Sequence, residues 1–188
     1  GTEYQPGDAR ICQRCGVDEG ILDVEYDLAA VRRNLSREVL DARPANHWRY
    51  RELLPLQQDF DPQPWHIGWT PLIEAPRLAK ALGVRRLRLK DETRSASGSF
   101  KDRASSVGVS RALQEGCTQV ACASTGNAAS SLAHCAAAAG LQANIFVGER
   151  IPEGKLAQLL AYGARVFKIQ GSYDEAYRLC IEACHRYG

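Results

Sequence analysis

Short apolar runs alternate with longer helical segments along the second half of the chain. The runs "RRLRLK", "TQVACA", "ANIFVG" and "RVFKI" are too short for helices and predict strands. Helical patterns follow them over residues 99–114, the alanine-rich stretch "AASSLAHCAAAAG", residues 152–162 and residues 173–185. Strands that alternate with helices of about 10–15 residues are typical of βαβ units. The pattern therefore predicts an α/β protein with a parallel sheet, flanking helices and right-handed crossovers.

Composition narrows the class of protein. The 188 residues are 45% apolar and 24% charged with a net charge of +2, which is ordinary for a globular protein and predicts no nucleic-acid partner. No apolar run approaches the roughly 20 residues of a transmembrane helix, so we expect no membrane partner. The seven cysteines are an odd number in mostly apolar surroundings, which favours reduced thiols and a cytoplasmic location. Because the chain begins at Gly1 without Met, we expect its true start to lie earlier.

The stretch "SGSFKDR" (97–103) places a lysine where a helix is expected to begin. Ser99 and Asp102 have the spacing of a capping box, with Ser99 as N-cap and Asp102 at position N3. Lys101 would then occupy position N2, where a cation opposes the helix dipole at a cost of roughly 0.3–1 kcal/mol. Two interpretations stay open: a solvated surface lysine, or an amine that is kept easy to deprotonate for imine formation with a carbonyl compound.

Two polar loops precede predicted helices. One is Ser95–Ser99, after the strand that ends near Lys90, and the other is "STGN" (Ser124–Asn127), after "TQVACA". In parallel sheets, ligands bind at the carboxyl ends of the strands, where helix N-termini receive anions. We therefore expect both loops at this edge of the sheet, with Lys101 beside them.

The loop "STGN" allows two interpretations. In the first, Gly126 lets a ligand approach the backbone closely, and Asn127 donates a hydrogen bond to a ring oxygen or a carboxylate. In the second, the loop is a plain strand-to-helix turn with Thr125 as the helix cap. Spacing alone does not decide between them.

Five motifs in register resemble a known family. They are "TPL" (70–72), "LKDE" (89–92), "GSFKDR" (98–103), "STGNAASSLA" (124–133) and "IPEGKLAQLLAYGARV" (151–166). Together they resemble the fold-type-II enzymes that depend on pyridoxal 5'-phosphate (PLP), whose fold is tryptophan synthase β-like, and most closely the threonine synthase family. The match is dense over residues 65–188 and loose before them.

The resemblance implies roles for individual residues. Lys101 would carry PLP as an imine and then move protons at the α and β carbons of the substrate. Asn127 would contact the ring hydroxyl oxygen of PLP, and Phe100 would pack near the cofactor or, equally well, lie in the core. The α-carboxylate of an amino-acid substrate would be bound by Ser124, Thr125, Gly126 and Asn127. The implied reaction converts O-phospho-L-homoserine and water into L-threonine and phosphate.

The resemblance also implies a division of the chain. Residues 1–26 would be the remnant of a small cysteine-containing ribbon, residues 27–84 a connecting segment of the large PLP domain, and residues 85–188 the parallel α/β domain. The chain would be truncated after Gly188, before the residues that hold the phosphate of PLP. Threonine synthases are commonly dimers or monomers, so the resemblance is compatible with a homodimer and does not decide the oligomeric state.

Other assignments stay open. One keeps the cofactor and changes the reaction, as in a threonine dehydratase or a β-replacement synthase. Another is a non-catalytic binding or regulatory domain that retains the fold. We assign no metal, because Cys12 and Cys15 are one pair where a zinc site needs four ligands, and Cys180 and Cys184 suit the core side of a helix.

Overall fold

The computed structural model describes residues 3–5, 22–57 and 65–187 of the chain. The cysteine pair of the predicted ribbon, Cys12 and Cys15, lies outside these residues. Asp27 and Ser36 cap two short helices through their side chains. The helices before residue 58 are α1 (Leu28–Asn34), α2 (Arg37–Asp41) and the 3₁₀ helix η1 (His47–Leu53).

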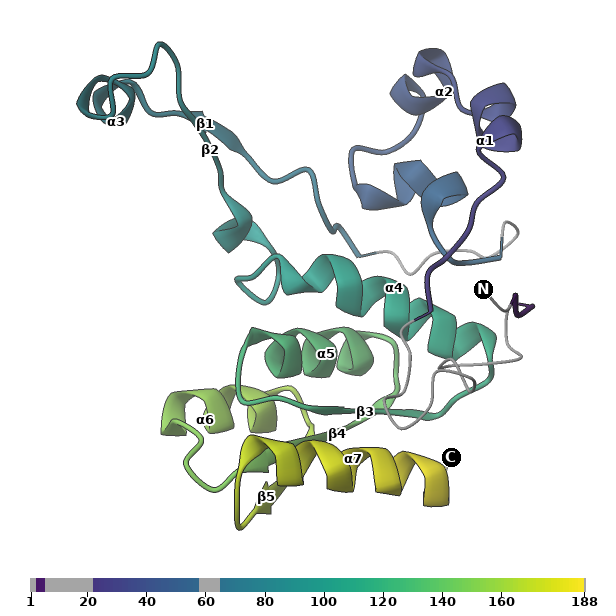
Figure 1. The fold of residues 1–188 in the computed structure, drawn as a ribbon, viewed down its shortest axis with the longest axis vertical. Coiled ribbons are helices and arrows are strands. Elements are labelled where there is room, and N and C mark those ends of the chain that lie inside the picture. The colour runs from purple at the N-terminus through teal and green to yellow at the C-terminus, as the bar shows by residue number, and fades with distance from the viewer. Residues whose placement is uncertain (1–2, 6–21, 58–64, 188) are drawn as a thin grey trace.

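An antiparallel pair of strands projects from the rest of the fold at the upper left of Figure 1. It consists of β1 (Leu72–Glu74) and β2 (Arg88–Lys90), joined through α3 (Pro76–Ala81), and η2 (Glu92–Arg94) follows. The prediction that the strand ending near Lys90 belongs to the parallel sheet is wrong. In "RLRLK" charged residues alternate with leucines and every residue of β2 is exposed, whereas strands of a buried parallel sheet are almost continuously apolar.

A parallel sheet of three strands forms the centre of the described structure, in the order β3-β4-β5. Its strands are β3 (Gln119–Ala123), β4 (Gln142–Gly148) and β5 (Arg165–Ile169). The helices are α4 (Lys101–Gln114), α5 (Asn127–Ala138), α6 (Glu153–Ala161) and α7 (Tyr173–Tyr187). In Figure 1, α5 and α7 lie on opposite sides of the sheet, and α4 packs along α5. The predicted α/β class, with a parallel sheet and flanking helices, is confirmed.

The central strand β4 serves two apolar layers because its side chains alternate between the faces of the sheet. Ile145 and Val147 point into the layer under α5 and α6, together with Leu159, and all three are almost completely buried. Phe146 points into the layer under α7, against Ala176 and Cys180. Each large aliphatic side chain buried in this way stabilises the fold by about 1.5–3 kcal/mol.

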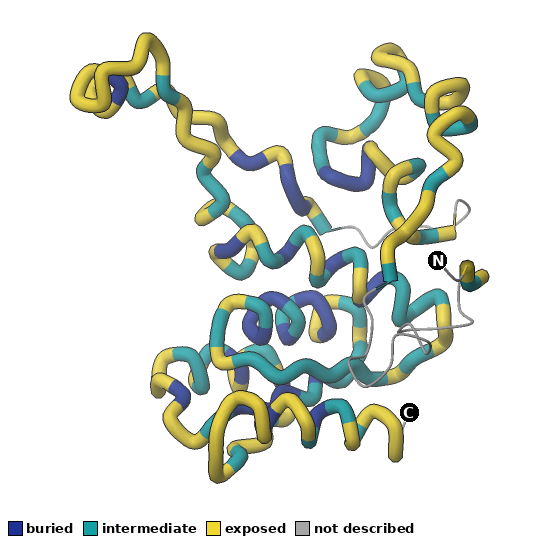
Figure 2. The backbone as a smooth tube through the Cα atoms, viewed as in Figure 1, coloured by how far each residue is buried: buried dark blue, intermediate teal, exposed yellow. Residues whose placement is uncertain are grey.

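The alanine-rich helix α5 is the most deeply buried helix in Figure 2. Ala129, Ala133 and Ala136 are completely buried against the sheet and α6. On the side of α4, Cys135 packs with Val109. Small side chains at these positions allow α5 to lie close to its neighbours, so the alanine run is a packed helix and not a linker.

The order of elements also determines where the helices begin. α4 and α5 start on the same side of Figure 1, at the edge of the sheet where β3 ends. A hydrogen bond between Lys155 and Asn127 brings the start of α6 to the same place. Because β3 and β4 are parallel, the helices that follow them, α5 and α6, begin at the same edge of the sheet. α4 runs back toward the start of β3, so its first turn lies at that edge as well. The first turns of three helices therefore share one edge of the sheet.

Candidate functional site

Lys101 is the first residue of α4, so the predicted N2 position in a Ser99 capping box is wrong. Phe100 occupies the N-cap position with helical backbone angles and no side-chain cap. The chain already turns before the helix, because the Asp102 amide donates to the Ser99 carbonyl at 3.3 Å. The Ser99 hydroxyl therefore accepts a hydrogen bond from the amide of Lys101, also at 3.3 Å. A capping box would instead have paired this hydroxyl with the amide three residues after Ser99.

The Asp102 carboxylate holds the loop before Lys101. Asp102 is completely buried, and it accepts a hydrogen bond from the Ser97 amide at 2.8 Å and another from the Ser97 hydroxyl. It also faces α5, since its charge adds to burial in raising the pKa of Cys135 to about 12. The buried carboxylate thus fastens the loop Ser95–Ser99 to the start of α4, a role beyond the helix support expected from the sequence.

The amine of Lys101 lies beside an exposed aromatic ring. Its Nζ is 4.9 Å from the centroid of the Phe100 ring, and 56% of Phe100 is exposed. Phe100 is therefore not a core residue, which removes one of the two interpretations of this side chain. Among the described carboxylates, none forms an ion pair with Lys101, so the half-buried amine is open to a ligand.

The loop Ser124–Asn127 follows β3, at the carboxyl end of a parallel strand as predicted. Gly126 is the N-cap residue of α5, and no side chain caps the helix. The interpretation with Thr125 as the cap is therefore wrong; Thr125 is exposed, and the Ser124 hydroxyl accepts from the Gly126 amide at 3.1 Å. The uncapped first turn of α5 offers its N–H groups to an anion.

Asn127 is held by a lysine that the sequence did not single out. Lys155 Nζ donates to Asn127 Oδ1 at 2.7 Å. This contact joins the first turns of α5 and α6. It occupies the amide oxygen of Asn127 and leaves the amide nitrogen available as a donor.

Side chains from three of the sequence motifs meet in one polar cluster. The motifs taken one at a time did not predict this contact. Arg103 Nη2 donates to Glu92 Oε1 at 2.8 Å, and Arg103 Nε donates to Glu92 Oε2 at 3.1 Å. The Thr70 hydroxyl donates to Glu92 Oε1 at 2.7 Å. The hydrogen bonds from Arg103, and then that from Thr70, hold the pKa of Glu92 below its usual value. This cluster ties "TPL" and "LKDE" to the helix that carries Lys101.

Next to this cluster, His47 is buried where η1 packs on α4. Its ring is tilted by 59° against the ring of Trp48, with 4.0 Å between centroids, and its Nε2 lies 3.3 Å from the Ser106 hydroxyl. A Cβ on Gly68 would lie 3.0 Å from Arg103 Nη1 and 3.2 Å from His47, and Gly68 has a φ of +84°, so only glycine suits this position. Burial, and then the charge of Arg103, lower the pKa of His47 to about 4.

We expect His47 to make the fold sensitive to acid. Its pKa is about 4 in the folded chain against an ordinary 6.5, so its stabilising effect is complete above pH 6.5 and is lost as the pH falls toward 4. The loss should be about 2–3 kcal/mol in the free energy of unfolding, measured by urea denaturation across this range. His47→Gln should flatten the curve, while the same change at the exposed His66 should not. Parallel curves for both variants would contradict this role.

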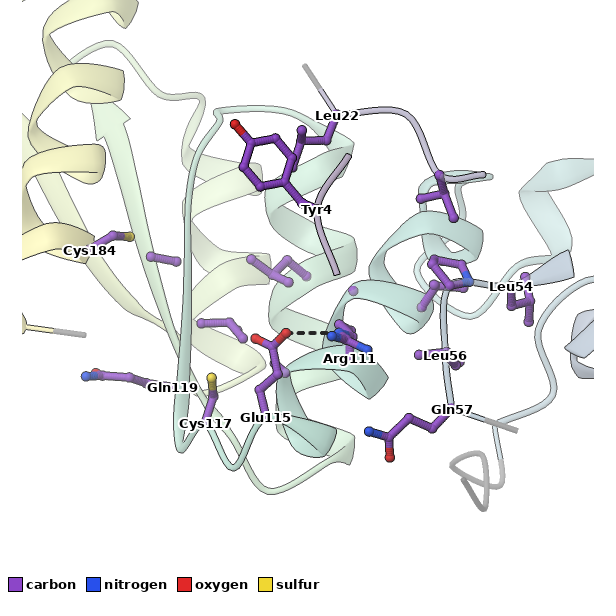
Figure 3. Close-up of a pocket in the computed structure, with 18 of the residues that line it drawn as sticks. Tyr4, Leu22, Leu54, Leu56, Gln57, Arg111, Glu115, Cys117, Gln119 and Cys184 are labelled. Atoms are coloured by element: carbon purple, nitrogen blue, oxygen red, sulfur yellow. Dashed lines mark hydrogen bonds and ion pairs between the residues drawn. The ribbon is translucent and has the colours of Figure 1, made fainter. Parts of the chain in front are cut away.

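A large hollow lies beside the C-terminal half of α4 (Figure 3). It has a volume of about 2,380 Å³ and is lined on α4 by residues from Val107 onward, including Arg111, which pairs with Glu115 at 2.9 Å. Its other walls come from residues before 58, from the sheet and from α7. None of the predicted site residues lines this hollow. The chemistry suggested by the sequence therefore belongs to the opposite end of α4.

The described residues contain neither a cluster of metal ligands nor a membrane-spanning helix. No group of three or more His, Cys, Asp or Glu side chains there is placed to hold a metal ion. No helix in the described ranges is long and apolar enough to cross a membrane.

Comparison with curated proteins finds threonine synthases. That of Methanosarcina acetivorans is 37% identical over 186 residues, which is 98% of this chain and 44% of the relative. That of Methanocaldococcus jannaschii is 38% identical over 178 residues, 88% of this chain and 44% of the relative. The chain thus spans less than half the length of these relatives.

Among solved structures, diaminopropionate ammonia lyase from Escherichia coli matches 67% of this chain and 37% of its own with a TM-score of 0.61; at 20% identity it shows the fold alone. Threonine deaminase isoform 2 from Solanum lycopersicum, in its processed form, matches 62% of this chain and 32% of its own with a TM-score of 0.58 and 28% identity. The model of the family "Pyridoxal-phosphate dependent enzyme" matches residues 65–188, the part that contains Lys101 and the parallel sheet. The chain belongs to the family of pyridoxal-phosphate dependent enzymes, with fold type II and PLP as the cofactor.

Proposed function

We propose that the chain is the lysine-bearing part of a threonine synthase, which converts O-phospho-L-homoserine and water into L-threonine and phosphate. The observation that carries this proposal is the similarity to threonine synthases along 98% of the chain. We further propose the division at residues 1–26, 27–84 and 85–188, and a cytoplasmic enzyme that acts on an amino acid as a monomer or homodimer.

The residues present suit PLP. The half-buried amine of Lys101 has no described carboxylate partner, and the first turn of α5 has no side-chain cap. An amine is the group that holds PLP through its aldehyde, and Asn127 offers a donor to the ring oxygen. Phe100 lies close enough to the amine to cover one side of the cofactor. When bound, PLP supplies an electron sink for carbanions on the substrate.

The substrate would be placed by the loop after β3. Ser124 and Thr125 provide hydroxyl groups, and the backbone N–H groups from Gly126 onward point along the uncapped start of α5. Such groups bind a carboxylate and orient the α carbon of an amino acid. The amine of Lys101 would take and return protons at the α and β carbons.

The test uses the full-length protein with PLP. Incubation with O-phospho-L-homoserine should release L-threonine and phosphate in equal amounts, as measured by chromatography and a phosphate assay. Borohydride reduction and peptide mapping should place a phosphopyridoxyl group on Lys101. Ketone formation from threonine without phosphate release would instead indicate the dehydratase alternative. Absence of both turnover and label would indicate a non-catalytic domain.

A further inference from the structure

Lys155 is placed where a purely structural design would avoid a cation. It is the third residue of α6, so its charge opposes the positive end of that helix dipole. Its side chain nevertheless extends toward the first turn of α5, where Nζ donates to Asn127 Oδ1 at 2.7 Å. This stability cost, together with the contact to a proposed cofactor residue, indicates a function at the site.

The ammonium of Lys155 determines the orientation of the Asn127 amide. An ammonium has hydrogen-bond donors and no acceptor, so Lys155 can form a hydrogen bond only with the oxygen of the amide. The amide nitrogen of Asn127 must then face away from Lys155, with two hydrogens to donate. Without this partner the exposed amide could present either its oxygen or its nitrogen to a ligand.

Lys155 is itself held in position. Its Nζ also lies 3.5 Å from Gln158 Oε1, and the same oxygen accepts a hydrogen bond from the Ser130 hydroxyl at 2.9 Å. Ser130 is buried in α5, one turn after Asn127. The contacts thus close a ring between α5 and α6 that limits the movement of the ammonium.

From this geometry we infer that Lys155 is a positioning residue, which holds the Asn127 amide so that its nitrogen donates to the ring oxygen of PLP. The inference rests on the proposed function, because it requires PLP beside Asn127. In this role Lys155 does not itself contact the reacting atoms.

The test measures PLP binding to the full-length protein, by titration of cofactor absorbance. Lys155→Met keeps the aliphatic stem and removes the donor; it should raise the Kd for PLP about three- to tenfold, the value of one hydrogen bond. It should also alter the balance between the visible and near-ultraviolet bands of the bound cofactor, which depends on hydrogen bonding at the ring oxygen. Lys155→Arg should restore most of both. Lys168→Met, at an exposed position of β5, is the matched control and should change neither.

A double-mutant cycle separates positioning from a merely structural role. In the background of Asn127→Ala, Lys155→Met should leave the Kd unchanged within about twofold, because the amide that it orients is gone. An undiminished loss in that background would overturn the inference, as would a Lys155→Met protein that matches the Lys168→Met control. Failure of the unmodified protein to bind PLP at Lys101 would overturn the proposed function as well, so the two failures are distinguishable.

Discussion

Replacement of Lys101 by alanine is expected to abolish turnover in the full-length enzyme and to remove the site of borohydride labelling. The reason is that one amine both holds PLP and moves protons at the substrate carbons. Loss of the proton transfers alone should lower kcat by about 10²–10⁴-fold. Steady-state kinetics with O-phospho-L-homoserine and mass spectrometry of the reduced protein measure the two effects.

The matched control for Lys101→Ala is Lys80→Ala, which changes an exposed lysine of α3. It should keep both the wild-type rate and the label on Lys101. Substantial turnover by Lys101→Ala would contradict the assignment, whereas a label on another lysine would move the site elsewhere.

Replacement of Asp102 by alanine is expected to cause the largest loss of stability among the site variants. The completely buried carboxylate accepts from both the amide and the hydroxyl of Ser97, and its removal breaks both hydrogen bonds. A hydrogen bond to a charged group contributes about 1.5–3 kcal/mol, so we expect a loss of about 2–3 kcal/mol in the free energy of unfolding. Urea denaturation monitored by circular dichroism measures this loss.

Asp102→Asn is the informative comparison, because it preserves size and one acceptor oxygen. It should lose about half as much stability as Asp102→Ala. Since the loop Ser95–Ser99 leads into Lys101, Asp102→Ala should also slow the labelling of Lys101 by PLP. Equal midpoints for both variants and the unmodified chain would show that Asp102 does not hold this loop.

The sequence alone was enough to predict the α/β class, because the spacing of apolar residues along the chain reflects which side chains are buried. Short and largely apolar runs marked β3, β4 and β5, and the alanine-rich pattern marked α5. The error at β2 has the same basis. Its alternation of charges and leucines indicated a strand, but the identity of its partner, β1, depends on a contact across residues 75–87 that local pattern does not contain.

The start of α4 shows the limit of local rules. Ser99 and Asp102 had the spacing of a capping box, yet Asp102 is drawn into the interface with α5 and binds Ser97. Helix starts are set by competition between local caps and tertiary partners, and a buried carboxylate gains more from two donors than from one.

By itself, the sequence determined the class of fold, the family and the lysine that carries the proposed chemistry, because these depend on periodicity and on motifs that are contiguous along the chain. Only the tertiary structure decided how those motifs meet. Glu92 joins Thr70 to Arg103, and Lys155 reaches Asn127 from another helix, 28 residues away in the chain. Such pairings arise from the packing of helices on a sheet, and the spacing of residues along one segment carries no record of them.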